Sequence, residues 1–178
     1  MLVFYEDLSA YSYSDDGDKF TDCTTGVRFV SFQPAYERLN VGWLEAAQPW
    51  TQGPVSDGFT DKLLKILAVQ EVNGTLGLHH CDFCPGLDDS NPWFTPRPGH
   101  RCASAGTSEI RVPGPPGIAF AAPQLVGHYV ADHGYLPPQR FVDAVFAFDL
   151  QMASSTLYPW ITFPWIPDGA DLYDARFE

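Results

Sequence analysis

The sequence predicts a single α+β domain (1–178), with a small, mainly antiparallel sheet, about three helices and a local zinc knuckle. Three observations lead to this prediction. Short apolar segments separated by turn residues indicate strands, and other segments carry apolar residues at helical spacing. The stretch "GLHHCDFCPG" (77–86) brings histidines and cysteines together. At 178 residues, the chain also has the length of one ordinary domain.

Short strands are expected before the first helix. Residues 27–32, "VRFVSF", alternate weakly between apolar and polar, and residues 39–44, "LNVGWL", form a second short strand or a connecting segment. A helix then begins near Ser56 or Asp57, whose side chains can cap its free backbone N–H groups, and continues to about residue 70. Its apolar residues at helical spacing include Phe59, Leu63, Ile66 and Leu67.

The middle of the chain predicts a strand and a hairpin around a long loop. After the turn at Asn73, residues 75–80 form a short strand that leads into the cysteine pair. Residues 85–106 are rich in Pro and Gly without periodicity, as in a functional loop or lid. "SEIRV" (108–112) and "GIAFA" (117–121), joined by "PGPP", then predict a β-hairpin.

Two consecutive helices are expected after the hairpin. The first covers 123–133, with Pro123 in its first turn and Gly134 just past its end. The second begins behind two prolines, with Phe141, Val142, Val145 and Phe148 facing inward.

Composition limits the classes of function. The chain has 22 acidic and 10 basic side chains, a net charge of −12, and its Lys and Arg residues are scattered singly. Nucleic-acid binding is not expected, because contacts to phosphates need a clustered basic surface. The N-terminus does not have the pattern of a secretory signal, and no apolar run is long enough to span a membrane. We therefore expect a cytoplasmic protein whose partner is an unknown protein or small molecule.

The stretch "HHCDFC" predicts a metal site. Zinc prefers thiolate and imidazole ligands in a tetrahedron, and the C-x-x-C spacing allows two sulfurs of one turn to reach the same ion. If residues 79–81 are extended, His79 and Cys81 face the same way and His80 faces the opposite side. The local unit is then His79, Cys81 and Cys84, with one zinc ion as the expected cofactor.

A fourth ligand must come from another segment, and spacing leaves two sets open. Cys102 or His100, in "GHRC", would close a compact knuckle across the long loop. His128 or His133, on the later helix, would tie the knuckle to the core. His133 also has a simpler interpretation, as a buried histidine bonded to a carbonyl or a charge at the helix C-terminus. At about 100° per residue along a helix, His128 is expected to point well away from His133.

Other chemistry is less favoured by the sequence. A redox C-x-x-C usually opens a helix, which lowers the pKa of its thiol, whereas Pro85 and Gly86 directly follow Cys84. The sequence has no G-x-S-x-G, no Gly-rich phosphate loop and no H-E-x-x-H. Glu109 and Asp132 would suit a general base near a metal, although a surface charge is the more common role for such residues.

Several separated segments together resemble an uncharacterised, mainly actinobacterial family, a domain of unknown function. They are "GLHHCDFCPG", "SEIRV", "HYVADHGY" and the "PP" that follows, with "NVGWL" further upstream. The resemblance covers about 39–148 and sets apart an N-terminal segment, 1–38, and an aromatic, Pro-rich tail, 149–178. It implies His79, Cys81, Cys84 and a histidine of "HYVADH" as ligands, which favours His128 over Cys102.

The function that the sequence favours is a zinc-site protein acting as a binding or adaptor module with a mainly structural metal. A closed site with four protein ligands is structural, because catalysis needs an open position for water or substrate. The alternative is a small hydrolytic or biosynthetic enzyme, with an open zinc site under the loop 85–106. A third hypothesis is that the chain is an acidic immunity or inhibitor protein that binds a basic partner.

Overall fold

The structure is a computed structural model, and it describes residues 4–13, 22–24, 29–32, 36–74, 77–84, 96, 98–153 and 171–173. Within these residues the chain is α+β, as predicted, with three α-helices, one short 3-10 helix and three small sheets. Most of the loop 85–106 and most of the aromatic tail lie outside the described residues, so the expected lid and the packing of the tail stay predictions.

The central sheet has the strand order β3 (Glu37–Asn40), β7 (Ile118–Pro123) and β6 (Glu109–Pro113). β6 and β7 form the predicted antiparallel hairpin, in which Glu109 is opposite Pro123. β3 lies parallel to β7, with Glu37 beside Ile118, so the central sheet is mixed. Apolar alternation alone does not distinguish these two directions, because it reports which face is buried and not which strand is the neighbour.

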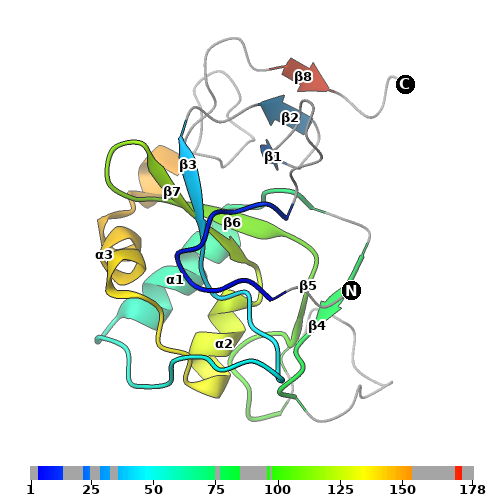
Figure 1. Cartoon of the computed structure of the whole chain (residues 1–178), viewed down its shortest axis with the longest axis vertical. Helices are drawn as coiled ribbons and strands as arrows, with labels where there is room; N and C mark the ends of the chain where they lie inside the picture. Colours follow the sequence, from blue (N-terminus) through cyan, green and yellow to red (C-terminus); the bar gives the residue numbers. More distant parts are fainter. Residues whose placement is uncertain are drawn as a thin grey trace.

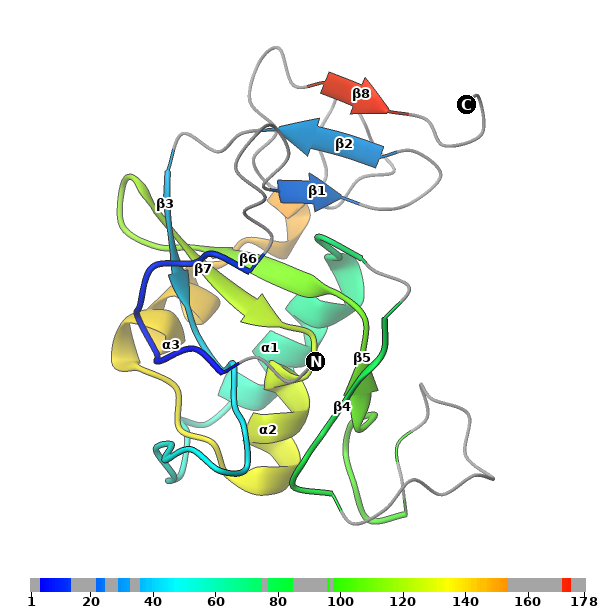
Figure 2. The same cartoon turned by 45° about the vertical axis from the view of Figure 1, so that its right-hand side comes forward.

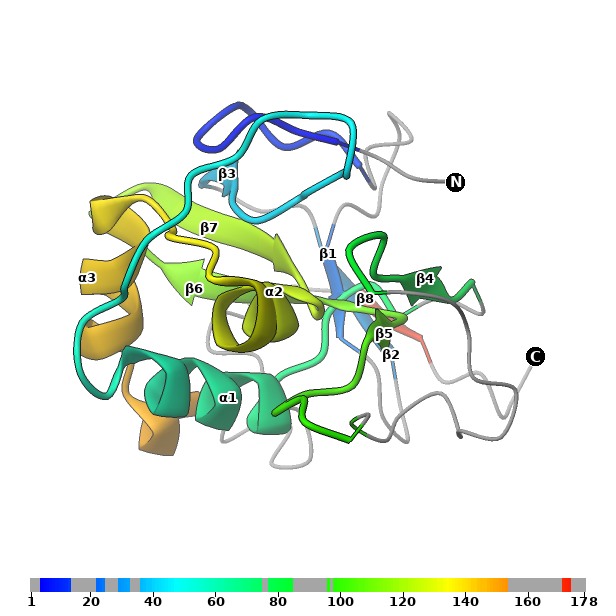
Figure 3. The same cartoon turned by 90° about the horizontal axis from the view of Figure 1, so that it is seen from below.

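Three helices cover one side of this sheet: α1 (Phe59–Val69), α2 (Val126–His133) and α3 (Gln139–Ala147) (Figure 1). The N-terminal segment, residues 4–13, runs along the outer edge of β3, where Ala10 pairs with Leu39 and Tyr11 N donates to Arg38 O at 2.9 Å (Figure 3). None of the helices in the described part of the chain is long and apolar enough to cross a bilayer.

The helix boundaries differ from the predicted ones in two places. The expected side-chain cap of the first helix is wrong, because α1 begins after Gly58, whose φ of 79° makes the turn, and no side chain caps it. Pro123 is the last residue of β7 and not part of a helix. The predicted end of α2 is confirmed, since Gly134 adopts a left-handed conformation and donates its N–H to Tyr129 O.

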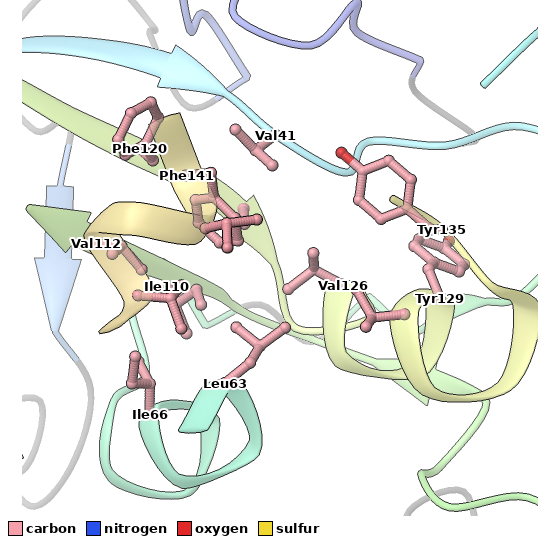
Figure 4. Packing of buried hydrophobic residues seen from close by; sticks show 14 of the residues in the cluster. Val41, Leu63, Ile66, Ile110, Val112, Phe120, Val126, Tyr129, Tyr135 and Phe141 are labelled. Atoms are coloured by element: carbon pink, nitrogen blue, oxygen red, sulfur yellow. The ribbon is translucent and has the colours of Figure 1, made fainter. Parts of the chain in front are cut away.

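The core lies between the sheet and the helices (Figure 4). Phe59, Leu63 and Ile66 of α1 are fully buried, as their helical spacing predicts. The central sheet and the other two helices contribute further buried residues, among them Ile110, Val112, Phe120, Val126, Phe141 and Val145.

Two further sheets lie outside this core. β1 (Asp22–Thr24), β2 (Phe29–Phe32) and β8 (Asp171–Tyr173) form an antiparallel sheet at one end of the molecule (Figure 2). β2 confirms a strand within the predicted segment 27–32, and the 3-10 helix Leu150–Ala153 follows α3. At the other end, β4 (His79–His80) pairs with β5 (Ala105–Gly106).

Glu109 is part of a buried ion pair and not a surface charge. Its Oε2 accepts from Arg111 Nη1 at 2.7 Å, and the two side chains are 3% and 0% exposed. Tyr11 OH donates to Oε1 at 2.9 Å, and the ring of Tyr11 also lies 4.6 Å from the Arg111 guanidinium. β6 thus carries a buried charge pair, and the N-terminal segment supplies some of its further contacts.

Replacing Arg111 with Met should be strongly destabilising. Arg111→Met leaves the Glu109 carboxylate buried without its cation, and we expect the free energy of unfolding to fall by about 3 kcal/mol. Denaturant titration measures this loss. Arg101→Met is the control, because its ion pair with Asp61 is 53% and 69% exposed and should contribute less than about 1 kcal/mol. Equal losses in the two variants would contradict the prediction.

Candidate metal centre

The candidate metal centre is built where the turn after β4 meets α2. Cys81 N donates to Ser104 O at 2.8 Å, which extends the β4–β5 pairing to the first cysteine. A tight turn follows, in which Cys84 N approaches Cys81 O at 3.4 Å. The helix contributes His128 from its middle and His133 from its last position. Two segments far apart in sequence therefore supply two ligand candidates each.

Four ligand atoms converge within 4.8 Å of one another, one each from Cys81, Cys84, His128 and His133. Cys84 Sγ lies 3.2 Å from His128 Nε2 and 3.4 Å from His133 Nε2. Cys81 Sγ lies 3.3 Å from His133 Nε2, and the two Nε2 atoms are 3.0 Å apart. No disulfide joins the cysteines in the described residues.

These separations match the edges of a zinc tetrahedron. Zinc bonds of about 2.3 Å to sulfur and about 2.05 Å to nitrogen give ligand-to-ligand distances of about 3.3 to 3.8 Å. The sulfur-to-nitrogen distances of 3.2 to 3.4 Å and the nitrogen-to-nitrogen distance of 3.0 Å are within a few tenths of an ångström of these edges. The cluster has the size and the Cys2His2 donor set of a four-coordinate zinc site.

Asp132 fixes the orientation of one imidazole. Its Oδ2 lies 2.8 Å from His128 Nδ1, so this nitrogen carries the proton and Nε2 presents a lone pair to the cysteines. The carboxylate is itself held by backbone N–H groups, from Arg101 at 2.7 Å and Cys102 at 3.2 Å. A carboxylate behind a histidine is the usual outer support of a metal ligand. The spacing of four residues between the two side chains is a helical signal that the sequence does contain.

In a comparison with protein families, residues 3–146 match the domain of unknown function DUF7919. The chain belongs to this family. The match includes most of the N-terminal segment 1–38 and contains all four residues of the cluster. No curated protein and no solved structure is significantly similar to the chain.

Burial sets the protonation of the ligands in the DUF7919 domain. It raises the pKa of the Cys81 thiol to about 12, partly offset by the Phe83 backbone N–H. Burial lowers the pKa of His128, and so does the neighbouring His133, although Asp132 opposes this shift. Burial also lowers the pKa of His133. At neutral pH the histidines are therefore ready to bind a metal, whereas Cys81 must first lose a proton.

The orientation expected for the two histidines of α2 is wrong. Their Cα positions diverge around the helix axis, but His133 is the last residue before Gly134, whose φ is 72°. No following turn blocks the end of the helix, so the long imidazole side chain reaches across to place its Nε2 3.0 Å from that of His128. The simpler interpretation of His133, a histidine bonded to a carbonyl, does not describe its contacts with the cysteines.

The structure brings together three of the predicted ligands, Cys81, Cys84 and His128, and places His133 with them. His79 lies apart from this cluster, with its Nε2 3.0 Å from Tyr13 OH. The strand rule that grouped it with Cys81 does not hold, because β4 ends at His80 and a turn follows from Asp82.

The other candidates for a fourth ligand surround the cluster without joining it. His100 stacks on His128 at 5.4 Å between ring centroids, and its Nδ1 is 3.9 Å from Cys84 Sγ. Cys102 contributes its backbone N–H to Asp132. Both residues therefore support the ligands and do not complete the set of four.

Removing the Asp132 charge should weaken metal binding. Asp132→Asn loses the carboxylate that orients and polarises His128, and we expect zinc affinity to fall by about 10- to 100-fold. Competition with a chromophoric chelator measures the affinity. Asp143→Asn, on the exposed face of α3, is the matched control and should leave it unchanged. An unchanged zinc affinity in Asp132→Asn would show that Asp132 does not support the metal site.

Zinc affinity should rise with pH. Because the Cys81 pKa is raised to about 12 in the metal-free protein, zinc must displace its proton throughout the neutral range. Each displaced proton increases the apparent affinity about tenfold per pH unit. Calorimetry between pH 6.5 and 8, in buffers of different ionisation enthalpy, counts the protons released. An affinity that does not change with pH would exclude Cys81 as a thiolate ligand.

Proposed function

We propose that this DUF7919 domain is a zinc-site protein that acts as a binding or adaptor module, in which zinc has a structural role. The observation that carries the proposal is the convergence of four Cys and His ligand atoms within 4.8 Å. Four protein ligands occupy every vertex of the zinc tetrahedron, which leaves no position for a reactive water. The soft sulfur donors favour zinc over magnesium, calcium or manganese.

The structural role follows from what the metal would connect. Cys81 and His133 are 52 residues apart in sequence. Cys81 directly follows a strand of a short two-stranded ribbon, and His133 ends a core helix. The ribbon has only two residues in each strand, which is too little pairing to be stable by itself. Zinc bonds to both segments would hold the ribbon in place against α2.

The partner that we propose is a small molecule or a protein, and not a nucleic acid. The net charge of −12 opposes phosphate binding. The free thiols that the site requires fit a reducing compartment, and we place the protein in the cytoplasm.

Metal analysis of single-residue variants tests the site. We expect about one zinc per chain in protein purified without added metal, and loss of zinc in Cys81→Ser and in His133→Ala. His79→Ala and Cys102→Ser should both keep it, because these residues lie outside the set of four. Elemental analysis by mass spectrometry gives the stoichiometry, and circular dichroism checks that each variant is folded.

Cobalt replacement then distinguishes a closed site from an open one. A closed Cys2His2 site should give the intense visible bands of tetrahedral cobalt, with no change on adding azide or cyanide. Weaker bands that change with added anion would show an open position and would favour an enzyme. A wild-type protein without metal would contradict the proposal outright.

A further inference from the structure

A cleft lies beside β4 and opens to solvent. Its walls come from the N-terminal segment, the residues after β3, both strands of the β4–β5 ribbon, and the start of α2. Tyr13, Trp43, His79, Gln124 and Tyr129 are among the residues that line it. None of the four residues of the metal cluster lines the cleft.

Trp43, which is 5% exposed, forms a rigid part of the apolar wall. Its indole Nε1–H donates to Ala121 O at 3.1 Å, so the polar atom of the ring is satisfied inside the protein. Tyr5 packs edge-on against the indole at 5.7 Å between centroids, and Tyr13 packs at 4.8 Å with a tilt of 46°. A ring held from several sides gives a ligand a preformed surface, which limits the entropy lost on binding.

Polar groups lie beside this apolar wall. His79 Nε2 pairs with Tyr13 OH at 3.0 Å, and its Nδ1 has no partner in the described part of the chain. Gln124 Oε1 accepts from Thr107 N at 3.2 Å, which orients the amide and leaves its NH2 group without a partner among the described residues. A ring nitrogen and an amide NH2, each fixed through its other polar atom, can accept from and donate to one ligand.

The residues that line the cleft present no net charge to a ligand. It contains no Lys or Arg among the described residues, and its one carboxylate, Glu109, is neutralised by Arg111 at 2.7 Å. The protein as a whole carries a net charge of −12, so an anion would be repelled on approach. A polar ligand of this cleft must therefore be recognised through hydrogen bonds and ring contact.

We propose that the cleft binds an uncharged small molecule with a flat aromatic ring and an amide-like hydrogen-bonding group. The ring packs against Tyr13 and the exposed part of Trp43, and the polar group bonds to His79 and Gln124. This inference rests on the proposed function, because it names the class of ligand that the binding module takes. His79 reaches the cleft from β4, two residues before Cys81, so the zinc that anchors the turn also positions a wall of the cleft.

Three probes that differ mainly in charge test the class of ligand. The probes are 2-naphthamide, which is uncharged, 2-naphthoate, an anion, and 2-naphthamidine, a cation. We expect the naphthamide to bind the zinc-loaded protein in roughly the millimolar range or tighter. In ¹H–¹⁵N spectra it should shift the Trp43 indole N–H and the amides of residues 106–109. The naphthoate and the naphthamidine should each bind at least fivefold more weakly.

Substitutions in the cleft test its location. His79→Ala and Gln124→Ala should each weaken naphthamide binding at least fivefold, whereas Gln139→Ala, on the exposed start of α3, should not change it. Zinc content is measured on the same samples.

Naphthamide binding that does not change in His79→Ala and Gln124→Ala, or equal or tighter binding of either charged probe, would overturn the inference. If naphthamide fails to bind protein that holds one zinc, the inference fails but the metal site stands. Absence of zinc contradicts the proposed function whatever the probes do.

Discussion

Helix α2 packs so closely against its neighbours that the direction in which each of its sides faces is fixed. A Cβ placed on Gly127 would lie 2.5 Å from Leu67 Cδ1 and 3.0 Å from Leu64 Cδ2, so α1 approaches α2 directly at a glycine. Val126, Tyr129 and Val130 are buried in the core. This packing fixes the rotation of the helix about its axis, and with it the positions from which His128 and His133 reach the cysteines.

The metal cluster is therefore supported by the core and not by its own loop. The cysteine turn follows a ribbon of two-residue strands, whereas the helical histidines lie on an element that is buried along most of its length. Asp132 links the two, because it bonds to His128 on the helix and to backbone N–H groups of residues 101 and 102 in the loop. A metal bound here would add bonds between parts of very different intrinsic stability.

The elements that the sequence predicts well are those whose signal is local. The hairpin, the inward faces of α1 and α3, and the glycine that ends α2 depend on neighbouring residues. The metal cluster could be predicted only in part. The two cysteines of the C-x-x-C and His128 were predicted as members of the cluster. His79 was grouped with them on the assumption that the chain stays extended through Cys81. The direction of His133 was predicted from its angle on a helix, without regard to the length of its side chain. The cleft had no signal in the sequence, because its walls come from six separate segments.

The parallel pairing of β3 with β7 has a consequence for how the chain folds during synthesis. The hairpin β6–β7 is local, but β3 has its partner about 80 residues later in the sequence, since Asn40 lies beside Ala121. The first part of the chain therefore leaves the ribosome with the edge of β3 unpaired and must wait for residues 118–123 to emerge. Contacts of such long range slow folding. During this interval the acidic N-terminal half of the chain exposes the unpaired edge of β3 to other chains.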